Sequence, residues 1–210
     1  STNLLKEDIS VKHKEAIVSK PFAILAACTF LNSLLVTGMT FHQTSILGEI
    51  GYSQSRSAIM FIPVALGSIS GGFLFGWLAD KKLRTYLPAQ VMFLVALASL
   101  LAGLADSIPT VVLYSFLLGT CYGGCSATNG ALIPWLFGVV EVAAIAGTLS
   151  FVTVFSSSFG PFIFSLGDEV FGSYRSASII FSIFPILLGI FVTIVKPHRI
   201  SCLYKDSDGG

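Results

Sequence analysis

The chain has 210 residues, of which 54% are hydrophobic and 11% are charged, and its mean hydropathy is +0.84. Because a soluble domain carries about 25% charged residues, this composition excludes an ordinary soluble protein. The net charge of +1 offers no electrostatic basis for binding nucleic acid. We therefore expect the lipid bilayer as the main partner and no nucleic acid.

Six segments are apolar and long enough to cross a bilayer, whose hydrocarbon core of about 30 Å needs about 20 residues of helix. Three prolines fall inside them, where membrane helices tolerate a kink. The predicted fold class is an all-α membrane protein whose 21–197 region is a six-helix bundle. The predicted spans are residues 21–43, 57–79, 86–105, 110–133, 145–167 and 176–195.

The two ends of the chain are more polar than the bundle. Residues 1–20 are predicted to be a solvated cytoplasmic linker, with a short surface helix around residues 12–15 as the less favoured alternative. Residues 198–210 are predicted to be a cytoplasmic tail. Their polar, glycine-containing end is typical of disorder.

Lysine and arginine are distributed unevenly between the two sides of the predicted bundle. With six spans, both termini share one side with the loops after spans two and four. Ten of the twelve basic residues fall on that side, and only Arg56 and Arg175 fall on the other. Because basic loops remain in the cytoplasm, both termini are predicted to be cytoplasmic. The predicted location of the bundle is the plasma (cell inner) membrane.

Small residues recur at intervals of four in spans two and four. They include Gly67 and Gly71 in span two, and Gly119 and Gly123 in span four. Small residues allow membrane helices to approach closely, so these faces are predicted to be helix-packing surfaces. Smooth faces along which transporter helices slide are the alternative.

Polar side chains recur on one face of spans one, four and five. Serine and threonine can bond to their own helix, whereas the amides of Asn32 and Asn129 should face protein or water. A water-filled path between these spans is one interpretation, and an ordinary helix surface is the other. The candidate lining residues are Asn32, Thr37, Tyr122, Ser126, Asn129 and Ser157.

His42 lies near the outer end of span one, off its row of hydroxyl side chains. An imidazole changes its charge near physiological pH, which makes this residue a candidate proton-responsive gate. A solvated histidine at the membrane interface is the favoured alternative.

Acidic and basic residues are missing from the centre of every predicted span. Catalysis inside a membrane needs converging titratable groups, and the chain has no phosphate-binding loop or hydrolase motif. The four cysteines have no zinc-site spacing. The sequence therefore predicts no enzyme activity, no cofactor and no metal site.

The loop between spans two and three carries a sharply patterned polar segment, Gly76-Trp-Leu-Ala-Asp-Lys-Lys-Leu-Arg84. It resembles the loop motif G-x-L-A-D-[RK]-x-G-[RK]-[RK] of the major facilitator superfamily, although Leu83 and Thr85 replace a glycine and a base. Over about residues 21 to 197, further stretches resemble the second half of monocarboxylate-porter-like and related bacterial members. These stretches are 40–43, 51–53, 137–138, 145–147 and 160–161.

This resemblance implies one half of a major facilitator fold, namely the C-terminal six helices of a secondary transporter. Residues 1–20 would then be the end of the central linker. The implied partners are an N-terminal six-helix half, missing from this chain, and a small organic solute, with carboxylates as the class that the nearest subgroup favours. The implied function is symport or antiport by alternating access.

Within the motif, the resemblance implies a conformational latch. Gly76 would allow a close helix approach, Asp80 would cap a helix or pair with a base, and Lys81 and Arg84 would complete the charge network. The alternative is that the basic residues only anchor the chain in the membrane.

Two other kinds of protein remain open. One is a non-transporting membrane protein or truncated gene product that acts through helix–helix association. The other is a six-helix carrier or channel that assembles with copies of itself.

Overall fold

The structure is a computed structural model that describes residues 11–81 and 84–198, in which all regular elements are helical. Six segments of this part of the chain are long and apolar enough to cross a membrane. The prediction of a six-span, all-helical membrane protein is therefore confirmed at this level. The segments are Lys20–Phe41, Gln54–Ala79, Arg84–Leu104, Ile108–Phe137, Val142–Phe171 and Tyr174–Val195.

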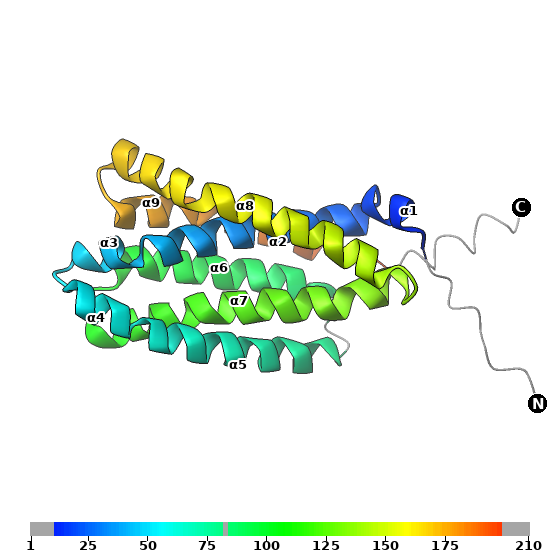
Figure 1. Ribbon diagram of the computed structural model, residues 1–210, viewed down its shortest axis with the longest axis horizontal. Helices are drawn as coiled ribbons and strands as arrows, with labels where there is room; N and C mark the ends of the chain where they lie inside the picture. Colours follow the sequence, from blue (N-terminus) through cyan, green and yellow to red (C-terminus); the bar gives the residue numbers. More distant parts are fainter. Residues whose placement is uncertain (1–10, 82–83, 199–210) are drawn as a thin grey trace, which may run out of the picture.

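The helices are α1 (His13–Ile17), α2 (Lys20–Phe41), α3 (Gln43–Gly48), α4 (Gln54–Ile59), α5 (Phe61–Ala79), α6 (Leu87–Leu104), α7 (Ile108–Phe137), α8 (Val142–Phe171), α9 (Tyr174–Phe181) and α10 (Ile183–Val195). A short 3-10 turn, η1 (Arg84–Tyr86), precedes the third span. Two of the spans consist of two consecutive α-helices, α4 with α5 and α9 with α10 (Figure 1).

Proline accounts for two of the helix breaks. The α4–α5 break falls at Met60, three residues before Pro63, and the α9–α10 break falls at Ser182, three residues before Pro185. A proline removes one helical N–H and its ring clashes with the carbonyl four residues earlier, which disrupts the helix at this distance. Pro161 lies within an uninterrupted α8.

Helices α7 and α8 are longer than predicted, at 30 residues each. At 1.5 Å per residue they exceed the hydrocarbon core of the bilayer. Local capping extends α7: Ser107 and Thr110 form a reciprocal capping box at its start, and Gly138 ends it at a φ of 83°. The added residues of α7 are uncharged, whereas those of α8 include Asp168 and Glu169 at its end.

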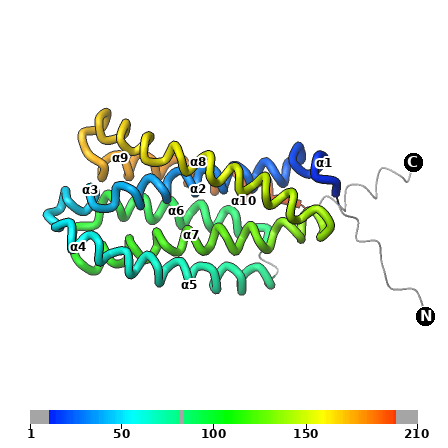
Figure 2. The backbone as a smooth tube through the Cα atoms, in the orientation of Figure 1, coloured from blue at the N-terminus to red at the C-terminus, as the bar shows by residue number. Residues whose placement is uncertain are grey.

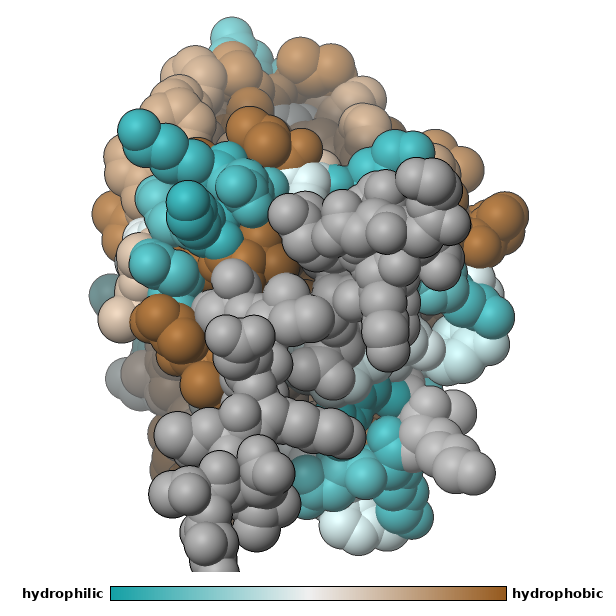
Figure 3. Space-filling model, turned by 90° about the vertical axis from the view of Figure 1, so that its right-hand side faces the viewer, coloured by the Kyte–Doolittle hydropathy of each residue, from teal (hydrophilic) through white to brown (hydrophobic). Residues whose placement is uncertain are grey.

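The bundle has two distinct ends. The terminal end carries the start of α2, the end of α10 and the α5–α6 and α7–α8 connections; the opposite end carries the other connections (Figure 1). Viewed from the terminal end, hydrophilic side chains gather among apolar ones (Figure 3). The described lysines and arginines at this end are Lys12, Lys14, Lys20, Lys81, Arg84 and Lys196.

Glycines bring α5 and α7 into backbone contact. A Cβ atom added to Gly67 or Gly71 of α5 would meet the backbone of Phe116 or Thr120 of α7. A Cβ atom added to Gly119 of α7 would meet the backbone of Val64. The predicted packing surfaces of spans two and four therefore face each other.

A second glycine contact joins α2 to α8. A Cβ atom added to Gly38 would lie 2.9 Å from the carbonyl oxygen of Gly160, and one added to Gly160 would meet the backbone of Leu34. The sequence analysis did not identify this pair, because Gly38 is the one glycine of α2 and the glycines of α8 do not recur at intervals of four.

The two glycine contacts relate the first three spans to the last three. The first set comprises α2, α5 and α6, and its second helix, α5, packs against α7, the first helix of the other set. In the second set (α7, α8, α10) the second helix packs against α2. Figure 2 shows α5 beside α7 and α8 beside α2. Each set has three spans, so the two sets run in opposite directions through the bundle.

The segment before α2 is helical and packs in part against the bundle, whereas a solvated linker was the favoured expectation for it. Residues 13–17 form α1, the less favoured alternative. Val11 and Ala16 are buried, and the Val11 N–H donates to the carbonyl of Phe137 at 2.9 Å. His13 Nε2 lies 2.8 Å from Thr148 Oγ1 of α8. Residues 1–10 and 199–210 lie outside the described residues.

Candidate functional site

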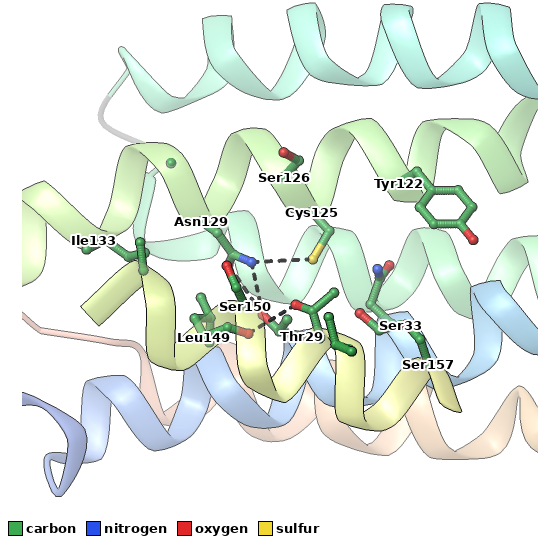
Figure 4. Close-up of a pocket in the computed structure, with 15 residues that line it drawn as sticks. Thr29, Ser33, Tyr122, Cys125, Ser126, Asn129, Ile133, Leu149, Ser150 and Ser157 are labelled. Carbon is green, nitrogen blue, oxygen red and sulfur yellow. Dashed lines mark hydrogen bonds between the residues drawn. The ribbon is translucent and has the colours of Figure 1, made fainter. Parts of the chain in front are cut away.

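A cavity of about 580 Å³ lies between α2, α7 and α8 (Figure 4). It extends from the middle of α2, at Thr29 and Ser33, toward the terminal end, at Ile133 of α7 and Ala146 of α8. These are spans one, four and five, the three that carry the polar faces. The polar lining residues are Thr29, Asn32, Ser33, Tyr122, Cys125, Ser126, Asn129, Ser150, Thr153 and Ser157.

A hydrogen-bonded group joins α2 to α7 inside this cavity. The Asn129 amide donates to Thr29 Oγ1 at 3.0 Å, and the Thr29 hydroxyl approaches Asn129 Oδ1 at 3.4 Å. The same amide approaches Cys125 Sγ at 3.8 Å (Figure 4). One partner of Asn129 thus lies on its own helix, and the nearer one, Thr29, comes from another span.

Other lining side chains already have partners on the protein. The Thr153 hydroxyl donates to the Leu149 carbonyl of its own helix at 3.1 Å. The Thr37 hydroxyl donates to Ser157 Oγ at 3.3 Å. These groups, like Asn129 and Thr29, have part of their hydrogen-bonding capacity used by the protein itself.

A third group of lining side chains is free within the described part of the chain. Asn32 is 3% exposed, and its Oδ1 is buried without a hydrogen-bond partner. The side chains of Ser33, Tyr122, Ser126 and Ser150 also form no hydrogen bond with described residues. Of these groups only Asn32 Oδ1 is a buried atom without a partner, which costs free energy; Ser126 and Ser150 are exposed and open to water or a solute.

Five of the six candidate lining residues lie on this cavity. They are Asn32, Tyr122, Ser126, Asn129 and Ser157. Thr37 does not line the cavity, but its hydroxyl donates a hydrogen bond to Ser157 of α8, which does. Cys125 was not among the candidates, although it shares a helix face with Tyr122 and Asn129, which is the signal that could have identified it.

Among the described residues that line the cavity, none carries a charge. No group of three or more His, Cys, Asp or Glu residues in residues 11–81 and 84–198 could hold a metal ion. The described lining therefore offers hydroxyl, amide and thiol groups.

His42 lies outside this cavity, at the break between α2 and α3. It is only 8% exposed, so the favoured interpretation of a solvated interfacial histidine is wrong. Its ring stacks on Tyr174 with centroids 4.5 Å apart, and its Nε2 lies 3.1 Å from the carbonyl oxygen of Pro161. The imidazole thus connects α2, α8 and α9, and its role as a gate stays a prediction.

The opposite end of the bundle holds a polar network that the sequence analysis missed. Glu49, after α3, accepts hydrogen bonds from Ser173 Oγ at 2.6 Å and from the Tyr174 N–H at 2.8 Å. Arg175 pairs with Asp106 at 2.6 Å, the one ion pair among the described residues. The only sequence signal is that each of these residues lies in a predicted connection between two spans.

The family-like motif lies at the terminal end. An added Cβ atom at Gly76 would meet nothing within 4 Å, so no helix of the described chain approaches closely there. Lys81 Nζ lies 3.2 Å from the centroid of the Trp77 ring. Arg84 Nε donates to the Ala79 carbonyl at 2.9 Å, which caps the end of α5.

The expected charge network around Asp80 is absent within residues 11–81 and 84–198. Asp80 is exposed and forms no ion pair there, because Lys81 turns to Trp77 and Arg84 turns to the helix end. Lys82, the remaining base of the loop, lies outside the described residues.

Neither a protein-family model nor a curated protein matches the chain. The basis for a function is therefore the site itself: an uncharged polar cavity at membrane depth, bounded by three helices.

Proposed function

We propose that the chain is the C-terminal six-helix half of a secondary transporter of the major facilitator type. It would move a small organic solute by alternating access, together with an N-terminal six-helix half. The observation that carries this proposal is the polar cavity between α2, α7 and α8.

The cavity needs a cover if the bundle lies in lipid. Lipid cannot hydrogen-bond to the free groups of Asn32, Tyr122 and Ser126, and a polar wall at membrane depth is stable only against protein or water. A second six-helix half would close the cavity and leave a water-filled path between the halves. The chain then supplies one wall.

The crossed packing of the two three-helix sets also favours a transporter. Many secondary transporters consist of repeats with inverted topology, and their solute sites lie near the membrane midplane between repeats. Here α2 and α7, the first helices of the two sets, both line the cavity. The glycine contacts that place α5 on α7 and α8 on α2 hold these two helices in position.

The distribution of basic residues supports an orientation in which the terminal end of the bundle faces the cytoplasm and the bundle lies in a plasma membrane. Six of the described lysines and arginines lie there and two at the opposite end. Gly76 and Asp80 are both open at this end, so they would be available to the second half, where the latch would form.

Solute flux tests the proposal. Labelled solutes would be offered to proteoliposomes that contain the chain, a candidate N-terminal half, or both, starting with the coding sequence directly upstream of Ser1. Uptake that needs both halves would support a transporter half. Uptake by the chain alone, with crosslinks between its copies, would instead indicate a self-assembling carrier or channel.

A second candidate function is helix-mediated association without transport. It is favoured by Gly72 and Gly76, four residues apart on α5, where an added Cβ atom meets nothing within 4 Å. Such a pair is a common dimerisation face in membranes. This function predicts stable homo-oligomers that Gly76→Leu disrupts and Asp80→Asn leaves intact; a monomer in lipid would exclude it.

A further inference from the structure

We propose that this cavity wall selects an uncharged solute with several hydroxyl groups and discriminates against a carboxylate. This inference rests on the proposed transport function and narrows the class of solute. It follows from which lining groups are charged, which are already paired, and which are free.

The first step is charge. No described lining residue is acidic or basic. Moving an ionised group out of water without a compensating charge is far more costly than moving a hydroxyl group that finds a hydrogen-bond partner. On this wall a carboxylate would meet hydroxyl and amide groups alone, with no cation to offset its desolvation.

The second step is the direction of the hydrogen bonds. Asn32 Oδ1 is a buried acceptor without a partner, and only a donor can satisfy it. A hydroxyl group of the solute donates and accepts, whereas a carboxylate accepts only. A bound carboxylate would therefore leave this oxygen unpaired, which carries the full cost of a buried orphan acceptor.

The third step is the arrangement of the free groups. Asn32 and Ser33 belong to α2, Tyr122 and Ser126 to α7, and Ser150 to α8. A solute with hydroxyl groups along its chain can bond to all three helices at once. The volume of about 580 Å³ falls within the usual range of small-molecule pockets.

The test uses two probes that differ in one group: ribitol, and ribonate, in which a terminal hydroxymethyl group of the same chain is a carboxylate. The reporter is Ser150→Cys, labelled with a membrane-impermeant thiol reagent in proteoliposomes. Ser70→Cys, on the exposed face of α5 away from the cavity, is the matched control. The unmodified chain gives the background of its own four cysteines, of which Cys28, Cys121 and Cys125 are described and buried.

We expect Ser150→Cys to react faster than Ser70→Cys, and ribitol to slow its reaction while ribonate does not. Protection by ribonate that equals or exceeds that by ribitol would overturn the inference and leave the transporter proposal standing. If Ser150→Cys reacts but neither probe protects it, the inference is also overturned and the transporter proposal again stands. If Ser150→Cys is as unreactive as Ser70→Cys, the cavity holds no water, and the transporter proposal fails together with the inference.

A second variant tests Asn32 directly. Asn32→Leu removes the free acceptor and should weaken protection by ribitol about threefold or more, the loss of one buried hydrogen bond, while labelling of Ser150→Cys persists. Thr193→Val is the control, because that hydroxyl bonds to the Gly189 carbonyl of its own helix and does not line the cavity. Unchanged protection in Asn32→Leu, or an equal loss in both variants, would contradict the role assigned to Asn32.

Discussion

The carboxylate of Glu49 accepts a hydrogen bond from the backbone N–H of Tyr174, with 2.8 Å between Oε1 and N. Tyr174 is the first residue of α9, so Glu49 places a negative charge at the N-terminus of that helix. This terminus carries partial positive charge from its unpaired N–H groups. Two residues that are 125 positions apart thereby tie the first span to the last at the opposite end of the bundle.

Replacing Glu49 should loosen this end of the molecule. We expect Glu49→Ala to lower the free energy of unfolding by about 1 kcal/mol, the usual contribution of a helix cap, and Glu49→Gln by less. The measurement is thermal unfolding in detergent, with hydrogen exchange of the first turn of α9. Glu169→Gln is the control, because Glu169 is exposed at the same end; an equal shift in both variants would refute the capping role.

Alanine substitutions at two adjacent glycines of α5 should change the free energy of unfolding in opposite directions. An added Cβ atom at Gly71 would lie 2.5 Å from the carbonyl oxygen of Thr120, whereas one at Gly72 meets nothing within 4 Å. Gly71→Ala must push α5 from α7 and should cost about 1–3 kcal/mol. Gly72→Ala should be neutral or stabilising by up to about 1 kcal/mol, since alanine favours helix.

Thermal unfolding of the two purified variants is the measurement. They share the helix, the substitution and the position along the membrane normal, so only the neighbouring backbone differs. Similar stabilities for Gly71→Ala and Gly72→Ala would mean that the α5–α7 contact is looser than the structure describes.

The sequence predicts this fold where a single residue type restricts the outcome. Span length follows from bilayer thickness, and the breaks at Met60 and Ser182 follow from Pro63 and Pro185. The cavity helices could be anticipated for a similar reason: the amides of Asn32 and Asn129 are not fully satisfied within their own helix.

Contacts between distant residues could not be predicted in this way. Nothing local distinguishes Glu49 from other exposed carboxylates, because its partners depend on how far α3 and α9 extend past the membrane. His42 looked like an interfacial residue for the same reason: its burial comes from Tyr174 and Pro161, which become neighbours only once α2, α8 and α9 are assembled.

The latch proposed for the terminal end has a specific signature. Asp80 forms no ion pair with described residues, so Asp80→Asn should leave the thermal stability of the chain alone unchanged. In the presence of an N-terminal half, the same variant should reduce uptake, because the latch between the halves is lost. Arg84→Ala is the comparison: it should lower stability by about 1 kcal/mol even in the chain alone, since Arg84 caps α5 through the Ala79 carbonyl. Loss of stability in Asp80→Asn without its partner half would place the contacts of Asp80 inside this chain.

His42 can be tested by separating its two contacts. His42→Phe keeps a ring against Tyr174 but loses the contact with the Pro161 carbonyl, and His42→Gln keeps a donor but loses the ring. Each variant should lower the free energy of unfolding by about 1 kcal/mol, because one buried interaction is removed in each. If His42 is the proton-responsive gate, uptake by the assembled halves should lose its dependence on external pH in both variants, since neither side chain can take up a proton. Uptake that keeps its pH dependence in either variant would leave His42 as a packing residue that joins α2 to α8 and α9.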